Sequence, residues 1–238
     1  MGASLTMVIH RATGRPFDPA GLAILLCGIA AAYSLDRVVD ADECHGPPWL
    51  TRSLTIVGVI ASIGCLILLT QLPAATRLLA PLIAVVALAY PRLKKLPGAK
   101  TMLVAVVWTW SAIAFPFNDG SWMGWRCALV PIAWPLLLLI AAGSLLCDLK
   151  DAERDRTNDV ASLPVLVGVT ATATIAVALA VLGTGLAIIE HRPGLAVGGA
   201  GLTLVGLRPP LLAGDVVGPL LVDAILTLPG ALIAAHLV

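Results

Sequence analysis

Residues Cys147 to Gly168 read CDLKDAERDRTNDVASLPVLVG, directly after a long apolar segment. Asp148, Asp151 and Asp155 have the spacing i, i+3 and i+7, which places the three carboxylates on one face of a helix. Acidic residues at the end of a membrane helix are costly unless they have a partner, and a divalent cation is a suitable one. This stretch therefore predicts a functional site at the mouth of a membrane helix.

The composition of the whole chain agrees with a membrane location. Of its 238 residues, 59% are hydrophobic and 12% are charged, and the mean hydropathy is +0.97. Soluble domains have about a quarter of their residues charged. We therefore expect an integral, multi-pass protein of the lipid bilayer, in the inner membrane of the cell. The formal net charge of +1 indicates no nucleic-acid partner.

Apolar segments of the chain predict an all-α fold, a polytopic bundle of about eight transmembrane helices. A bilayer needs about 20 residues of helix, and the third and seventh segments fall short of this length. The expected segments are 19–35, 54–72, 78–90, 101–117, 127–147, 165–189, 195–207 and 216–237. Residues 1–18 are expected to form a short N-terminal tail, and residues 19–238 a single transmembrane domain.

Lys and Arg residues predict the orientation, because short cytoplasmic loops are enriched in them. The loops after the first, third, fifth and seventh segments contain Arg37, Arg52, Arg92, Lys94, Lys95, Lys100, Lys150, Arg154, Arg156 and Arg208. The alternate loops contain only Arg77, Arg126 and Arg192, while Arg11 and Arg15 in the tail count against the placement. The side with more basic residues is therefore expected to face the cytoplasm, and the acidic motifs lie on that side.

A weak internal repeat supports a cavity shared by two acidic clusters. DRVVDADE begins at Asp36 and DLKDAERD at Asp148, about 112 residues later, and each follows an apolar span of the same orientation. Two parallel four-helix halves would bring both clusters to one cavity mouth.

The acidic clusters have the chemistry to bind magnesium and a diphosphate. Mg²⁺ prefers a few carboxylates together with waters and phosphate oxygens, and its charge stabilises a leaving diphosphate. The predicted metal ligands are Asp36, Asp40, Asp148, Asp151 and Asp155. Three of these, Asp36, Asp148 and Asp151, are also the predicted catalytic residues.

Basic residues near the clusters are candidates for holding the remaining phosphate oxygens. They are Arg37, Lys94, Lys95 and Arg156. Tyr33, three residues before Asp36, either joins them at the cavity mouth or anchors its helix at the membrane interface. The apolar bundle would accept a hydrocarbon tail and keep water from a reactive allylic cation.

The Cys147–Gly168 stretch closely resembles the second aspartate-rich motif of the UbiA-type membrane prenyltransferase superfamily, roughly D-x-x-D-x-x-x-D-R followed by T-L-P-V-x-x-G. Two further stretches are similar to family motifs in the same order. YSLDRVVDADE resembles the first motif at Asp36 and Asp40, and AYPRLKKLPGAK resembles the Y-x-x-x-K-R segment at Tyr90, Lys94 and Lys95. The resemblance implies an Mg²⁺-dependent transfer of a prenyl group from an isoprenyl diphosphate to a hydrophobic acceptor: an aromatic compound, a quinone precursor, a tetrapyrrole or a lipid.

Two departures from the family pattern keep another function open. Ala32 and Tyr33 stand where the first motif has Asn-Asp, and the chain lacks one of the usual nine spans, which we expect to be the first. The alternative is a non-catalytic homologue that binds an isoprenoid or lipid, or a membrane partner of another enzyme. In addition, a mixed run such as DLKDAERDR also occurs as a solvated loop with local ion pairs.

Overall fold

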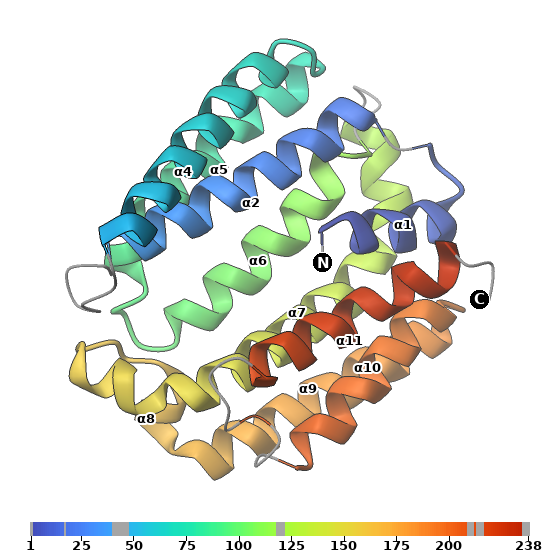
Figure 1. Ribbon diagram of the computed structural model, residues 1–238. Coiled ribbons are helices and arrows are strands. Elements are labelled where there is room, and N and C mark those ends of the chain that lie inside the picture. Colours follow the sequence, from blue (N-terminus) through green and yellow to red (C-terminus); the bar gives the residue numbers. More distant parts are fainter. Residues whose placement is uncertain are drawn as a thin grey trace.

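The computed structural model describes residues 2–16, 18–39, 48–117, 122–208, 212 and 217–234. Within these residues the chain forms ten helices and no strand, which confirms the predicted all-α class. The helices are α1 (Gly2–Thr13), α2 (Pro19–Val39), α4 (Pro48–Leu69), α5 (Ala74–Leu93), α6 (Ala99–Ala114), α7 (Trp122–Thr157), α8 (Leu163–Val167), α9 (Val169–Ile189), α10 (Pro193–Gly206) and α11 (Val217–Ala234) (Figure 1).

Seven of the eight predicted apolar segments fall on one helix each between α2 and α11, and the segment 165–189 begins in the short α8 and continues through α9. Five stretches are long and apolar enough to cross a membrane, namely Pro19–Val38, Trp49–Leu69, Thr76–Leu93, Pro131–Thr157 and Val169–Ile189. The described parts of α6, α10 and α11 are shorter apolar helices. These lengths support a polytopic membrane bundle, and the count of eight crossings stays a prediction.

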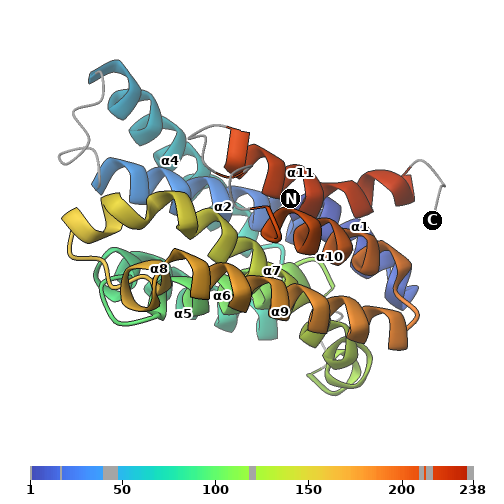
Figure 2. The ribbon, with the colours of Figure 1, turned by 90° about the horizontal axis from the view of Figure 1, so that it is seen from below.

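The helices pack in two groups that follow the order of the sequence. Helices α2, α4 and α5 lie on one side of the molecule, helices α7, α9, α10 and α11 lie on the other, and α6 lies between them (Figure 1). In the view from below, α4 lies at the edge of the bundle (Figure 2). In the first group α2 packs against α4 and α5, and in the second α9 packs against α7 and α10. Contacts between α6 and α7 join the groups, and α6 packs more against α7 than against α5. The division into two four-helix halves therefore stays a prediction.

Helix α7 is central, whereas α4 and α5 are peripheral. Of the 18 residues that form the apolar stretch of α7, 67% are buried, but only 6% are buried in the corresponding stretches of α4 and α5. Ile60 on α4 is 65% exposed and Leu78 on α5 is 75% exposed. Such apolar surface is unfavourable in water and favourable against lipid tails. The periphery of the bundle is therefore suited to contact with the bilayer.

The N-terminal residues form a helix that packs into the bundle, although the sequence predicted only a tail there. Helix α1 buries Leu5 and Ile9 in the core. The Ser4 hydroxyl donates a hydrogen bond to the carbonyl of Thr227 at 2.7 Å, and Gly230 N–H donates to Ser4 Oγ at 3.0 Å. At 12 residues α1 is too short to be recognised as a membrane span. Its burial depends on α11, at the other end of the sequence.

Candidate functional site

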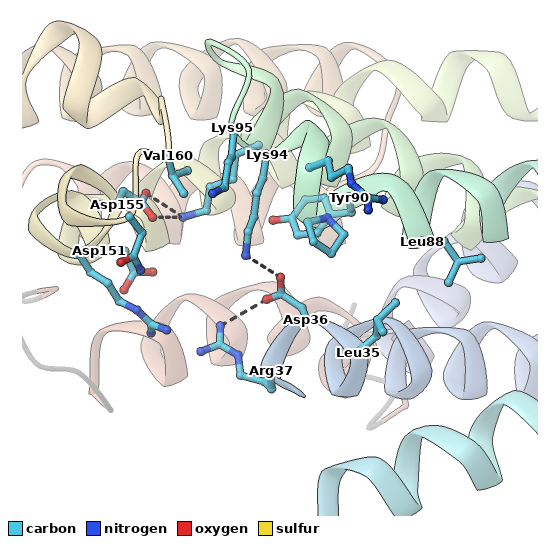
Figure 3. Close-up of a pocket in the computed structure, with 15 residues that line it drawn as sticks. Leu35, Asp36, Arg37, Leu88, Tyr90, Lys94, Lys95, Asp151, Asp155 and Val160 are labelled. Carbon is cyan, nitrogen blue, oxygen red and sulfur yellow. Dashed lines mark hydrogen bonds and ion pairs between the residues drawn. The ribbon is translucent and has the colours of Figure 1, made fainter. Parts of the chain in front are cut away.

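A cavity of about 440 Å³ lies at one end of the bundle, where α2, α5 and α7 end and α6 begins (Figure 3). Helix α7 continues to Thr157, ten residues beyond the predicted span, so the second acidic motif lies on an extension of a membrane helix. The cavity is lined by Leu35, Asp36, Arg37, Leu88, Tyr90, Pro91, Arg92, Lys94, Lys95, Lys100, Asp151, Arg154, Asp155, Asn158 and Val160.

The turn between α5 and α6 holds basic side chains beside the end of α7. Gly98 has φ +67, a left-handed conformation that glycine adopts without a steric penalty. Its N–H donates to the Ala161 carbonyl at 3.1 Å, and Val160 N–H donates to the Asp155 carbonyl at 2.8 Å. These hydrogen bonds tie the turn to the segment after α7, and Lys100 at the start of α6 thereby meets Asp155.

The first acidic motif contributes Asp36, which has basic neighbours. Lys94 Nζ lies 3.0 Å from Asp36 Oδ1, and Arg37 Nη2 lies 3.7 Å from Asp36 Oδ2 (Figure 3). The Arg37 guanidinium also lies 5.4 Å from the centroid of the Tyr33 ring, and Lys94 Nζ lies 5.9 Å from that of Tyr90. Arg37 Nε is buried without a hydrogen-bond partner among the described residues. This wall therefore holds a guanidinium donor suited to an anion.

The second acidic motif is organised around Lys100. Its ammonium nitrogen lies 2.9 Å from Asp148 Oδ1 and 2.9 Å from Asp155 Oδ2. The Thr101 hydroxyl donates to Asp148 Oδ2 at 3.1 Å. Asp155 lines the cavity, whereas Asp148 is only 3% exposed and lies behind the cavity wall. Asp151, which also lines the cavity, pairs with Lys150 at 2.6 Å.

Comparison with known proteins identifies the family. The model of the UbiA prenyltransferase family matches residues 49–233, which is most of the chain. The chain belongs to the UbiA prenyltransferase family. Among solved structures it is similar to the apo structure of a UbiA homolog from Aeropyrum pernix K1, with a TM-score of 0.76 and 19% identity over 100% of this chain and 97% of that one. The search of curated proteins found no match.

Membership of the UbiA family confirms the resemblance predicted from the motifs, and the structural match shows the same helical fold. The family implies a prenyltransferase activity in general, with an isoprenyl diphosphate and a hydrophobic acceptor as substrates. Together with the long apolar helices, it also indicates an integral membrane protein.

UbiA-family enzymes are generally metal-dependent, and the donor chemistry of the cavity fits a hard cation. No group of three or more His, Cys, Asp or Glu residues close enough to hold a metal ion occurs in the part of the chain that the structure describes. Magnesium, however, requires only one or two carboxylates when substrate phosphates and waters supply the other oxygens. Asp36, Asp151 and Asp155 all line the cavity and supply such carboxylates.

The structure brings six of the predicted site residues of this UbiA-family chain to one cavity and leaves three outside it. Those that line the cavity are Asp36, Arg37, Lys94, Lys95, Asp151 and Asp155. Asp148 lies behind the wall, and Tyr33 is 58% exposed beneath Arg37. Arg156 forms an exposed ion pair with Glu153 at 2.7 Å. The predicted ligand Asp40 lies outside the described residues.

Three basic residues of the cavity, Arg92, Lys100 and Arg154, were absent from the predicted site. Arg154 could have been found from helical spacing, because it follows Asp151 by three residues and shares its face, whereas Arg156 follows by five and does not. No local sequence pattern points to Lys100, because only the turn at Gly98 brings it into contact with the acidic motif.

Proposed function

We propose that this protein catalyses the Mg²⁺-dependent transfer of a prenyl group from an isoprenyl diphosphate to a hydrophobic acceptor within the membrane. One observation carries the proposal: Asp36 from the first motif lines the same cavity as Asp151 and Asp155 from the second. The motifs are more than 100 residues apart in the sequence. Their convergence supports a shared site over a solvated loop with local ion pairs.

The charge of the cavity favours a polyanionic ligand. The described lining residues include three carboxylates, Asp36, Asp151 and Asp155, and six basic side chains, Arg37, Arg92, Lys94, Lys95, Lys100 and Arg154. Ammonium and guanidinium groups form strong charge-assisted hydrogen bonds with phosphate oxygens. Lysines pair with all three carboxylates, and the remaining excess of positive charge favours a diphosphate.

The cavity also has an apolar side suited to the start of a prenyl chain. Leu35 and Leu88 lie beside Asp36 and Tyr90, away from the Asp151 end (Figure 3). A diphosphate at the charged end would therefore direct its hydrocarbon toward these leucines and the apolar bundle. Exclusion of water there protects an allylic cation from hydrolysis.

The reaction breaks the bond between the first prenyl carbon and the diphosphate oxygen, and the electron pair leaves with the diphosphate. The acceptor forms a new bond to that carbon and releases a proton. Basic side chains such as Lys94 and Arg37 stabilise the charge that develops on the departing diphosphate. A bound Mg²⁺, held by one or two of the cavity carboxylates Asp36, Asp151 and Asp155 together with phosphate oxygens and waters, would supply further neutralisation of that charge.

The charge distribution of the loops supports a cytoplasmic position for the cavity. Lys94, Lys95, Lys100 and Arg154 line the cavity, and the same end of the bundle carries most of the basic loop residues in the sequence. The diphosphate would therefore enter from the cytoplasm of the cell and the acceptor from the bilayer.

The test is release of diphosphate by the purified protein in lipid nanodiscs, with short and long isoprenyl diphosphates and acceptors of each predicted class. We expect turnover that needs Mg²⁺ and is lost in Asp36→Asn and Asp151→Asn. Glu153→Gln is the matched control, because Glu153 is an exposed acid on the same helix that does not line the cavity. Metal-dependent binding without turnover across the panel would favour the non-catalytic homologue.

A further inference from the structure

Lys100 has two acidic partners among the described residues. Its ammonium group bridges Asp148 and Asp155, at 2.9 Å from an oxygen of each, and it also lies 3.2 Å from Asp155 Oδ1. Lys94 pairs with Asp36, and Lys150 pairs with Asp151. Two carboxylates about two turns apart on α7 therefore hold one cation in place.

Asp148 is in contact with this lysine and not with the cavity. Lys100 approaches one of its carboxylate oxygens and the Thr101 hydroxyl donates to the other. At 3% exposure it is sealed behind the wall. Lys100, in contrast, lines the cavity. A buried carboxylate with both oxygens engaged stabilises its cationic partner, and in this position it is poorly placed to bind a metal ion.

We infer that Lys100 is a fixed cation that binds the diphosphate, and that Asp148 is a positioning residue that holds Lys100 rather than a metal ligand. The inference rests on the proposed function and changes the role of the first aspartate in the second motif. The bridging geometry orients the ammonium group before the substrate arrives, so less ordering is needed upon binding.

The first measurement is binding of inorganic pyrophosphate to the full-length protein, in the presence of a chelator that removes divalent metals. Lys100→Met is expected to weaken binding about tenfold, the effect of one lost charged hydrogen bond. Lys100→Arg, which keeps the charge, is expected to retain most of the affinity. Lys150→Met is the matched control, because Lys150 pairs with Asp151 on the same helix but does not line the cavity.

The second measurement is Mn²⁺ binding, followed by electron paramagnetic resonance in the presence of pyrophosphate. Asp148→Asn is expected to bind Mn²⁺ as the unmodified protein does, whereas Asp151→Asn binds it less tightly. Thermal unfolding of every variant shows whether it is folded. If Lys100→Met unfolds because two carboxylates then face each other, the double variant Lys100→Met, Asp148→Asn removes one charge of each sign and should show the same loss of pyrophosphate affinity.

Two results would overturn the inference and leave the proposed function standing. One is loss of Mn²⁺ binding in Asp148→Asn to the same degree as in Asp151→Asn, which would make Asp148 a ligand. The other is equal pyrophosphate affinity in Lys100→Met and Lys150→Met. If the unmodified protein binds neither pyrophosphate nor Mn²⁺, the proposed function fails and the inference fails with it.

Discussion

Lys94 Nζ lies 3.0 Å from Asp36 Oδ1, and this ion pair connects the end of α5 with the end of α2. Both side chains are largely buried and both line the cavity. The pair therefore joins the first acidic motif to the basic segment that follows Tyr90, two parts of the chain that are 58 residues apart. The pair fixes one wall of the cavity, and its contribution to the free energy of unfolding can be measured.

A double-mutant cycle on Asp36 and Lys94 is expected to show favourable coupling. Either Asp36→Asn or Lys94→Met leaves a partly buried charge without this ion pair. The two single changes together should therefore lower the free energy of unfolding by more than the double change does. We expect a coupling free energy of about 0.5–3 kcal/mol, measured by thermal or denaturant unfolding without substrate. Additive effects would show that the pair contributes nothing to the folded state.

Arg154 and Arg156 are expected to respond differently to substitution. Arg154 lines the cavity, whereas Arg156 pairs with Glu153 in an exposed position. Arg154→Gln should raise the KM for the isoprenyl diphosphate about tenfold, through loss of one charge-assisted contact. Arg156→Gln should change KM little, since exposed ion pairs contribute at most about 1 kcal/mol. Steady-state kinetics with varied diphosphate compares the two, and a larger effect at Arg156 would restore the role predicted from the sequence.

Gly230→Ala is expected to loosen α1 from α11. A Cβ at Gly230 would lie 2.5 Å from Ser4 Cα, which is backbone and cannot rotate away. Overpacking of this kind costs about 1–3 kcal/mol, and a lower unfolding temperature in detergent would report it.

Gly185→Ala is the control for that change, since it alters a helical glycine with no atom within 4 Å of the added Cβ. Alanine has the higher helix propensity, so this variant should unfold at the same temperature or slightly higher. Equal destabilisation of the two variants would exclude the contact with Ser4 as the cause.

Ile60→Arg is expected to impair membrane insertion. Ile60 lies near the middle of the Trp49–Leu69 segment and is 65% exposed. An arginine at the centre of a membrane helix costs about 2.5–3.5 kcal/mol on insertion scales. The fraction of protein in the membrane after expression measures the effect, with Ile60→Leu as the apolar control. Normal insertion of the arginine variant would mean that this face of α4 contacts water or protein instead of lipid.

The helical membrane fold and the existence of an acidic site could be predicted because both depend on local patterns. The length of the apolar segments located the helices from α2 to α11 apart from the short α8. The spacing of three or four residues, which puts side chains on one helical face, placed Asp151 and Asp155 together on α7. The same rule applied strictly would have chosen Arg154 over Arg156. Helix α1 was missed because its 12 residues carry no span-length signal and are buried only by a partner at the other end of the chain.

By itself the sequence determined that this chain is an all-helical membrane protein with two aspartate motifs and basic residues near them. Composition and periodicity are sufficient for this, since each helix satisfies its own backbone hydrogen bonds within the bilayer. The tertiary structure decided which charges meet. The sequence predicts Asp148 as a metal ligand, and in the structure Lys100, placed by the turn at Gly98, lies against one of its oxygens while Thr101 engages the other. This geometry is the basis of the positioning role that we infer. Contacts of this kind depend on distances between helices that are far apart in the sequence, and no local pattern encodes them.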